Sequence, residues 1–450
     1  MKNKVSYYTL VTEILPETNE RIIYSTRSGE SFIVSKDFYS CFLSDITSID
    51  RNIIQKLINA KILVNEDEDE FETIIRENKN AEDKKIDTLY HVIQPSANCQ
   101  LGCFYCGQTH TKETINGEIL EDIYNRIASK IPQRHFKSIA ITWYGGEPLM
   151  ALNQIKSFTP RLLTLAKENN LTYTSDMITN GLSLKKEVFY YLVEHCSLDS
   201  FQITIDGLKE EHDKRRYLKN GGGTFDVILK NILDIVGDDR YNELNKAISI
   251  RINVDNKNYQ SVISFIQLLA SYKLQDKLSV NIAPIHDWGE VNAAKDSLSK
   301  QDFADLEIDC YIEMIKHGFE IDIIPKRKEI VCMVVDKYSE VYDAYGNIST
   351  CWEVPYTDIY KESSYVIGNI KDKNFSLLDK NIPMRNWTNE IKEDNSKWCH
   401  SCKFLPVCGG SCPKHWYDNQ IPCPPFKKNM EDRLVLNYLS NNLELKKIIS

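Results

Sequence analysis

Between about Asp87 and Phe319, short apolar or alternating runs are separated by longer amphipathic stretches. The six runs are TLYHVIQPS, SIAITWYGG, YTSDMITNG, SFQITIDG, AISIRINVD and KLSVNIAPI. This alternation is typical of repeated βα units around a parallel sheet, which belongs to the α/β fold class. Six strands with intervening helices predict a partial (β/α)6 TIM-like barrel, with its active site where the strands end in polar or glycine-rich residues.

Two further regions flank the predicted barrel (residues 88–319) in this chain of 450 residues. Residues 1–87 are predicted to form a small winged-helix-like domain, closed by the acidic run from Glu66 to Glu72, which we interpret as a solvated linker. Residues 320–450 are rich in Cys, Pro and Lys and are expected to be loop-dominated and held by metal. The strand-like and helically spaced runs of the first domain are Arg21–Tyr24, Ser31–Val34, Lys36–Leu43 and Arg51–Ala60.

Charge and hydropathy restrict the kind of partner. The 55 Lys and Arg residues against 64 Asp and Glu give a net charge of -9 at pH 7, which disfavours a general nucleic-acid binder. No apolar run approaches the roughly 18 residues that cross a bilayer, and Thr12, Glu13 and Pro16 interrupt the N-terminal apolar stretch. The sequence therefore indicates an unexported, cytoplasmic protein without nucleic-acid or membrane partners.

Thirteen cysteines in such a chain indicate metal binding, because an odd number cannot all pair and a reducing cytosol disfavours disulfides. Three of them stand apart (Cys41, Cys196 and Cys310) and are expected to be small buried apolar residues without a further role. Three others follow the first predicted strand with the spacing C-x3-C-x2-C, and these are Cys99, Cys103 and Cys106.

Three thiolates on one tight loop can bind three corners of a cubane iron-sulfur cluster and leave the fourth iron open. A structural zinc site normally needs four protein ligands, and no fourth ligand lies nearby in the sequence. The spacing therefore favours a cluster that coordinates a further molecule over a zinc site.

With this loop, the chain resembles the radical S-adenosylmethionine (radical SAM) enzymes, in which a C-x3-C-x-aromatic-C loop follows the first strand of a six-strand barrel. The resemblance implies that S-adenosylmethionine chelates the open iron and that the three cysteines are both metal ligands and catalytic. It continues in TWYGGEP at the second strand, implied to receive the methionine ammonium group, and in segments at the third and fourth strands. The cofactor-binding residues implied in this way are Tyr105, Gly145, Gly146, Glu147, Pro148, Asn180, Thr204 and Arg216.

A second array of cysteines lies in the last third of the chain. Its order and spacing match the SPASM extension of radical SAM peptide and protein maturases, and a pair of zinc sites is the alternative. The resemblance implies two auxiliary 4Fe-4S clusters, so that the enzyme has three clusters with the SAM-binding one. The resemblance implies that one auxiliary cluster is bound by Cys399, Cys402, Cys408 and Cys423, and that three irons of the other are bound by Cys332, Cys351 and Cys412.

The cluster of Cys332, Cys351 and Cys412 lacks a fourth cysteine. We hypothesise that its fourth iron is open to a substrate atom, and a non-cysteine group or Cys310 is the alternative ligand. Reductive cleavage of S-adenosylmethionine gives a 5'-deoxyadenosyl radical that removes hydrogen from an unactivated C–H group. Auxiliary clusters suit oxidation, because bond formation after hydrogen loss releases an electron that needs an acceptor.

The expected activity is that of a maturase that cross-links a ribosomally synthesised (RiPP) precursor peptide through a carbon-carbon, carbon-oxygen or thioether bond. The expected partners are this peptide, with leader and core, and a flavodoxin- or ferredoxin-type electron donor. The N-terminal domain resembles the peptide-recognition (RRE-like) element of such maturases, whose edge strand pairs with a leader peptide.

The alternatives are a sulfatase maturase that generates formylglycine, a peptide epimerase, and a non-catalytic, metal-stapled peptide-binding protein. Sulfatase maturases usually have Asp as base directly after the second cysteine of the array. Here Cys351 is followed by Trp352 and then by Glu353, a candidate catalytic base, and Tyr or His residues that face the barrel are the alternatives.

Overall fold

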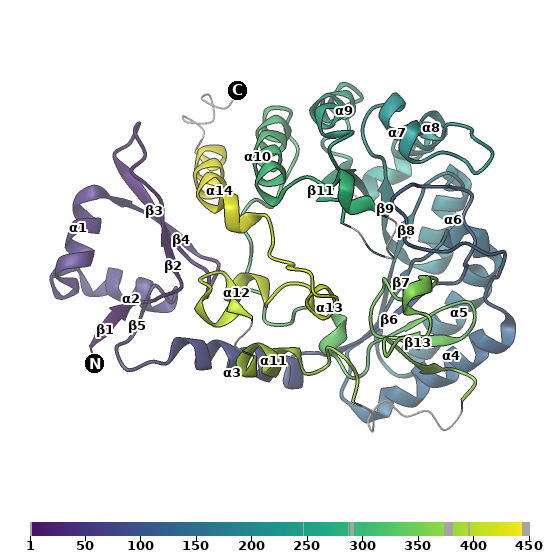
Figure 1. The fold of residues 1–450 in the computed structure, drawn as a ribbon, viewed down its shortest axis with the longest axis horizontal. Helices are drawn as coiled ribbons and strands as arrows, with labels where there is room; N and C mark the ends of the chain where they lie inside the picture. The colour runs from purple at the N-terminus through teal and green to yellow at the C-terminus, as the bar shows by residue number, and fades with distance from the viewer. Residues whose placement is uncertain are drawn as a thin grey trace.

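The computed structural model describes residues 2–245, 247–286, 288, 292–372, 381–394 and 397–442. Its centre is a nine-stranded sheet with the order β11-β10-β9-β8-β7-β6-β12-β13-β14 (Figure 1). From β7 to β11 each strand pairs in parallel with the one before it in the chain. The expected partial barrel is therefore confirmed, and each of the six runs coincides with one strand. These strands are β6 (Thr88–Ile93), β7 (Ser138–Trp143), β8 (Thr172–Thr179), β9 (Leu198–Thr204), β10 (Ile248–Val254) and β11 (Leu278–Pro284).

Helices cover the outer face of this sheet, as Figure 1 shows. In α4 the residues Ile119, Ile123 and Ile127 recur every fourth position and are all buried in the main hydrophobic core. In β10 alternate residues are buried against the helices, whereas Arg251 and Asn253 between them line the barrel interior. The covering helices are α4 (Gly117–Lys130), α5 (Leu152–Glu168), α6 (Lys186–Cys196), α7 (Lys209–Arg215), α8 (Phe225–Val236), α9 (Tyr259–Ser271) and α10 (Lys300–Lys316).

The C-terminal region extends the sheet beyond β6, which the sequence analysis did not predict. Strand β12 (Glu340–Tyr342) pairs in parallel with β6, and β13 (Asn347–Ser349) and β14 (Val366–Asn369) continue antiparallel. The fully buried carboxylate of Glu340 lies 2.6 Å from Arg126 Nη2 and 2.5 Å from Lys130 Nζ, both on α4. This ion pair anchors the C-terminal region to the barrel.

The rest of the C-terminal region combines loops with short helices. A small apolar core around the fully buried Trp387 is shared with the N-terminal part of the chain, which contributes Tyr8, Ile74 and Ile75. The last helix packs against α10, where Arg433 contacts Glu307. The region is therefore loop-rich, as expected, but side-chain packing also holds it together. Its helices are α11 (Trp387–Glu393), α12 (Leu405–Cys408), α13 (Pro413–Tyr417) and α14 (Phe426–Asn441).

The N-terminal unit lies at the other end of the molecule from the barrel, with the cysteine-rich region between them (Figure 1). It contains an antiparallel sheet with the order β2-β3-β4, in which β4 is an edge strand, and a short pair of β1 with β5. The predicted strands and helices of this unit are all present. Its elements are β1 (Asn3–Val5), β2 (Thr9–Val11), β3 (Glu20–Ser25), β4 (Ser31–Ser35), α1 (Lys36–Ser44), α2 (Arg51–Asn59) and β5 (Leu63–Asn65).

The acidic run from Glu66 to Glu72 is more than the expected solvated linker, because part of it is buried. Glu70 is 8% exposed and begins α3 (Glu70–Lys84). Its carboxylate accepts a hydrogen bond from Tyr7 N and lies 3.3 Å from the buried Arg27, which also contacts Glu68 at 2.9 Å. Negative charges gather here because an arginine lies inside the unit.

The structure also describes the three isolated cysteines and the lengths of the helices. Cys196 and Cys310 are buried as expected, whereas Cys41 is exposed on α1, so its expected burial is wrong. Within the described ranges, no helix combines the length and the apolar composition that crossing a membrane requires.

Candidate active site

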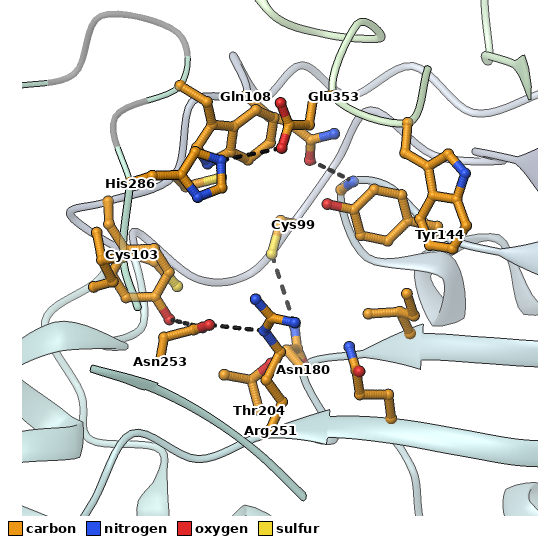
Figure 2. Close-up of a pocket in the computed structure, with 18 of the residues that line it drawn as sticks. Cys99, Cys103, Gln108, Tyr144, Asn180, Thr204, Arg251, Asn253, His286 and Glu353 are labelled. Carbon is orange, nitrogen blue, oxygen red and sulfur yellow. Dashed lines mark hydrogen bonds and ion pairs between the residues drawn. The ribbon is translucent and has the colours of Figure 1, made fainter. Parts of the chain in front are cut away.

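A cavity of about 500 Å³ lies at the carboxyl ends of the barrel strands, where the C-terminal region covers them (Figure 2). Its wall includes residues from the ends of β8, β9, β10 and β11, as the fold predicts for a barrel enzyme. Cysteines from both arrays line this one space. They are Cys99, Cys103, Cys106, Cys332, Cys351 and Cys412.

The first three cysteines lie on the loop that follows β6. Backbone N–H of Leu101 donates to Cys99 Sγ at 3.4 Å, and Asn180 Nδ2 lies 3.7 Å from the same sulfur. Burial raises the pKa of the Cys99 and Cys103 thiols to about 11. Buried thiolates need a compensating positive charge, so three convergent sulfurs in this position fit the binding of an iron-sulfur cluster.

The glycine-rich segment after β7 packs directly under this loop. Gly145 and Gly146 have φ of +80° and +54°, and a Cβ at Gly146 would lie 2.3 Å from the carbonyl oxygen of Ser96. Gly146 lines the cavity, and its N–H donates to Gln108 Oε1 at 2.9 Å. Glycine is required here because the backbone approaches the cysteine loop closely in a left-handed conformation.

Glu147 lies behind the glycines and is fully buried. Its carboxylate accepts hydrogen bonds from Thr179 Oγ1 at 2.6 Å, Asn180 N at 2.8 Å and Leu149 N at 3.0 Å. These bonds fix the end of β8 against the end of β7. Of the TWYGGEP residues implied to touch the cofactor, Gly146 lines the cavity, whereas Gly145, Glu147 and Pro148 support it from behind.

Tyr105, the aromatic residue of the cysteine loop, is held by a polar network. Its hydroxyl donates to Asp206 Oδ2 at 2.6 Å and accepts from Arg216 Nη1 at 2.6 Å and Asn253 Nδ2 at 3.2 Å. Arg216 is 7% exposed, and its Nε has no hydrogen-bond partner within the described structure. Nearby negative groups, among them Cys103 and Asp206, hold the pKa of Arg216 well above its usual value despite burial, so it is a fixed positive charge beside the three cysteines.

The structure also identifies wall residues that the sequence analysis missed. Gln202, Arg251 and Asn253 line the cavity together with the predicted Asn180 and Thr204. Gln202 and Asn253 lie in the carboxyl-terminal halves of β9 and β10, and Arg251 is the middle residue of β10. Strand alternation alone places them toward the barrel interior. Figure 2 shows Asn180, Thr204, Arg251 and Asn253 gathered on one side of Cys99.

The C-terminal cysteines form two groups. One group consists of Cys399 and its three neighbours Cys402, Cys408 and Cys423. Burial, followed by the charges of these neighbours, raises the pKa of Cys399 to about 12. The cavity-lining Cys332, Cys351 and Cys412 are the other group. Cys310 lies among the apolar side chains of the barrel core and not at the cavity, so the geometry does not support it as a fourth ligand.

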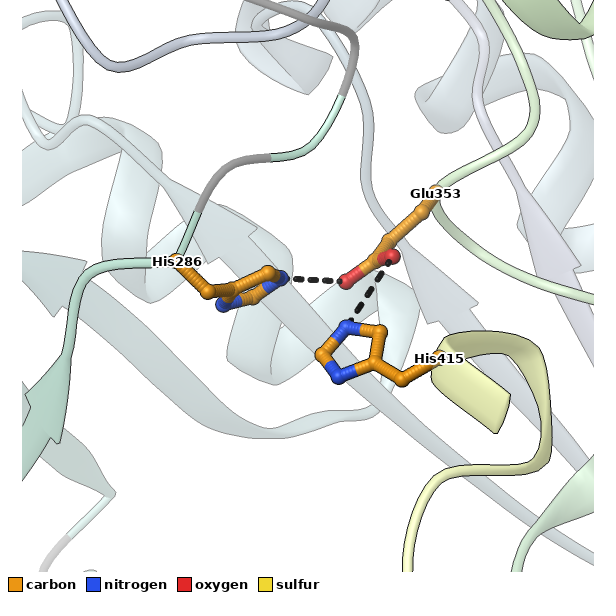
Figure 3. Close-up of side chains that lie close together, drawn as sticks. All are labelled: His286, Glu353 and His415. Atoms are coloured by element: carbon orange, nitrogen blue, oxygen red, sulfur yellow. Dashed lines mark hydrogen bonds and ion pairs between the residues drawn. The ribbon is translucent and has the colours of Figure 1, made fainter. Parts of the chain in front are cut away.

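Glu353 lies at the cavity wall near this second group, in a cluster with two histidines (Figure 3). Its Oε1 is 3.1 Å from His286 Nε2, and its Oε2 is 3.3 Å from Lys414 Nζ and 4.0 Å from His415 Nε2. Burial alone would raise the pKa of Glu353, but the hydrogen bond and charge of His286, together with Lys414 and His415, lower it to about 2.

A barrel with a three-cysteine loop after its first strand, facing a cavity, defines a metal-cluster enzyme. Residues 93–237 match the model of the Radical SAM superfamily. These residues therefore form a radical SAM domain, which makes the chain an enzyme and implies S-adenosylmethionine and a 4Fe-4S cluster as cofactors. The alternative of a non-catalytic binding protein is thereby set aside.

Three similar proteins extend the comparison beyond the barrel. A cysteine-type anaerobic sulfatase-maturating enzyme of Clostridium novyi is 24% identical over 79% of this chain and 98% of its own length. The structure of anSMEcpe with bound AdoMet and Cp18Cys peptide is 18% identical, has a TM-score of 0.59 and covers 79% of this chain and 99% of its own. Streptococcus suis SuiB bound to precursor peptide SuiA is 14% identical, has a TM-score of 0.50, and covers 94% of this chain and 99% of its own. At these identities the solved structures establish a shared fold.

Proposed function

We propose that this enzyme oxidatively cross-links side chains of a ribosomally synthesised precursor peptide. The supporting observation is the shared cavity, which is lined by the first cysteine loop and also by Cys332, Cys351 and Cys412. A side chain bound there lies between the group that removes a hydrogen atom and a group that accepts an electron. This arrangement suits a two-electron oxidation, because the electron released on bond formation has an acceptor nearby.

We assign the three loop cysteines to the SAM-binding cluster and the two C-terminal groups to two auxiliary 4Fe-4S clusters. Cleavage of S-adenosylmethionine bound at the first cluster supplies the radical that abstracts hydrogen. Gly146, Asn180, Thr204 and Arg216 line the space beside that cluster and are the proposed cofactor contacts. Arg216 is suited to the methionine carboxylate, because a guanidinium is the usual partner of a carboxylate.

The protein itself encloses and orients the reacting groups. Tyr144, Trp288 and Trp352 contribute large aromatic surfaces to the cavity wall, and Gln94 donates to the Trp352 carbonyl at 2.8 Å. This bond joins the end of β6 to the loop after Cys351. Apolar walls exclude water, and a fixed wall allows one C–H group to be selected by its position.

We assign residues 1–87 to leader-peptide recognition, residues 88–319 to the radical SAM barrel and residues 320–450 to a SPASM domain. Strand β4 is an edge strand, and its Ile33 is 49% exposed, so it offers unpaired backbone groups and an apolar contact to a further strand. The fold match to SuiB, crystallised with a precursor peptide, spans 94% of the chain, which is too much to omit this unit.

The N-terminal unit contacts the cysteine-rich region. Tyr7 Oη donates to Ser401 O at 2.7 Å, and Thr26 Oγ1 donates to Lys403 O at 2.7 Å. A bound leader is therefore tied through this region to the cavity.

We further assign a cytoplasmic location and a flavodoxin- or ferredoxin-type donor, since the clusters need low-potential electrons and a reducing compartment.

Formylglycine formation on a sulfatase is the second candidate. It is favoured by the Clostridium novyi relative, which matches over nearly its whole length. Against it, Trp352 occupies the position directly after Cys351, where sulfatase maturases usually have the Asp base. Peptide epimerisation uses the same first step and needs no electron acceptor.

The test is anaerobic reconstitution with iron and sulfide, followed by S-adenosylmethionine, reductant and a candidate precursor peptide. Peptide-dependent 5'-deoxyadenosine together with loss of two hydrogens from the peptide is the expected result. A product of unchanged mass with an inverted Cα identifies an epimerase, and formylglycine on a sulfatase peptide identifies the second candidate. Absence of 5'-deoxyadenosine under all these conditions contradicts the proposal.

A further inference from the structure

His286 and Glu353 form a pair at the cavity wall that joins two regions far apart in the sequence. His286 lies two residues after β11, on the barrel, whereas Glu353 lies two residues after Cys351 in the C-terminal region. Both line the cavity, and the imidazole is 40% exposed against 23% for the carboxylate. In the view of Figure 2 they lie on the opposite side of Cys99 from Asn180 and Thr204.

Oε1 of the carboxylate is hydrogen-bonded, and Oε2 has no hydrogen-bond partner within the described structure but lies in an ion pair. His286 Nε2 contacts Oε1 at 3.1 Å, and Lys414 Nζ lies 3.3 Å from Oε2. Lys414 is fixed in turn by Tyr360 Oη at 2.6 Å and Asp418 Oδ2 at 2.7 Å. The carboxylate is thus directed at protein groups, and the more exposed imidazole is the member of the pair that a substrate can reach.

The carboxylate also determines the tautomer of the imidazole. In the 3.1 Å contact we assign Nε2 of His286 as the donor and the carboxylate oxygen as the acceptor, so that Nδ1 keeps a free lone pair. Such a carboxylate-imidazole pair orients the ring and stabilises the imidazolium that forms when Nδ1 takes a proton.

We propose that His286 is the proton acceptor for the substrate nucleophile, and that Glu353 positions it. This inference rests on the proposed function. After a hydrogen atom has left the substrate carbon, the nucleophile Y–H of the peptide gives its proton to Nδ1, the C–Y bond forms, and one electron passes to an iron-sulfur cluster. The sequence analysis gave Glu353 and unspecified Tyr or His residues of the barrel as candidate bases, and the geometry assigns proton transfer to the histidine that Glu353 holds.

The same residues, with His415, could instead hold a metal ion, because their ligand atoms lie within 4.8 Å of one another. Lys414 argues against this, since a divalent ion at Glu353 would lie beside the ammonium group that already contacts the carboxylate. Metal binding is therefore an outcome that would overturn the proposal.

The experiment compares His286→Ala and His286→Gln with the wild type, after anaerobic reconstitution, by the ratio of modified peptide to 5'-deoxyadenosine. We expect the variants to keep peptide-dependent 5'-deoxyadenosine formation while the ratio falls at least tenfold. Added imidazole should restore the ratio in His286→Ala, which a merely structural role would not allow. Glu353→Gln should lower the ratio as well, without rescue by imidazole.

The matched control is His317→Ala. His317 pairs with Glu313 at 3.0 Å and is 38% exposed, so it reproduces the local chemistry of the pair, but it lies directly after α10 and outside the cavity. The ratio of modified peptide to 5'-deoxyadenosine in His317→Ala should equal that of the wild type. Equal iron content and absorption spectra of all variants show that the clusters are intact.

Three results would overturn the inference. They are an unchanged ratio in both His286 variants, loss of 5'-deoxyadenosine in proportion to product, and stoichiometric binding of Co²⁺ to the reconstituted enzyme that His286→Ala abolishes. Failure of the proposed function is distinct from these, because the wild type itself would then give no modified peptide.

Discussion

The buried carboxylate of Glu340 offers the sharpest test of how the C-terminal region is joined to the barrel. It is fully buried on β12 and contacts Arg126 and Lys130 of α4. Replacing it with Gln keeps the volume but leaves two cations inside the protein without a counter-charge. Breaking a buried ion pair in this way costs about 3–5 kcal/mol, and we expect about 3 kcal/mol because the amide oxygen still accepts a hydrogen bond.

The assay is equilibrium unfolding in urea, with hydrogen exchange at β6 and β12 to locate the effect. With a slope of about 3 kcal/mol per molar urea, the midpoint should fall by about 1 M. Asp234→Asn is the control, because Asp234 pairs with Lys230 on an exposed helix surface, where an ion pair contributes well under about 1 kcal/mol. A midpoint shift no larger than that of the control would refute the reasoning.

The same variant gives a pH signature. Burial opposes ionisation of Glu340, but Lys130 and Arg126 outweigh it and hold its pKa well below the usual 4.5. A carboxyl group with a lowered pKa stabilises the folded state above its unfolded pKa and loses that effect as the pH falls. The stability difference between wild type and Glu340→Gln should therefore be full above pH 4.5 and shrink below it.

The remaining predictions concern the cofactor loop, the N-terminal unit and the metal. Gly146→Ala adds about 1–2 kcal/mol of backbone strain and a clash with the Ser96 carbonyl, so calorimetry should show loss of S-adenosylmethionine binding, while Gly117→Ala, with open space around it, should bind normally. Arg27→Met leaves Glu70 buried without its cation, and hydrogen exchange in α3 should become faster; unchanged exchange would contradict this. Removal of iron by a chelator should make residues 320–450 sensitive to protease before the barrel, and equal protection of both regions would argue against metal-held structure.

The parts of the fold that the sequence predicted are those set by local pattern. Each barrel strand is a short apolar or alternating run. Consecutive strands of the barrel are neighbours in the sheet, so the order from β6 to β11 follows directly from the order along the chain. The junction of β12 with β6 was not predicted, because strand β12 has three residues and its partner lies some 250 positions earlier. Pairing over such a separation leaves no local periodicity to read.

The candidate site shows the same division. Motifs fix the three loop cysteines, Gly146 and Asn180 by their spacing, and all of them line the cavity. His286 was not found, since its importance depends on contact with Glu353, 67 positions away. The buried Glu70 was missed for a similar reason, because a run of acidic residues is ordinarily solvated, and only the tertiary position of Arg27 makes this carboxylate buried.

The central claim is that the first cysteine loop holds a cluster separate from those of the C-terminal array. Iron analysis with Mössbauer spectroscopy of the wild type and of a variant with Cys99, Cys103 and Cys106 all replaced by Ala tests it directly. Three 4Fe-4S clusters predict about twelve irons in the wild type and about eight in the variant, with 5'-deoxyadenosine formation abolished. Zinc in place of iron at the loop, or loss of all cluster signals together, would contradict the account.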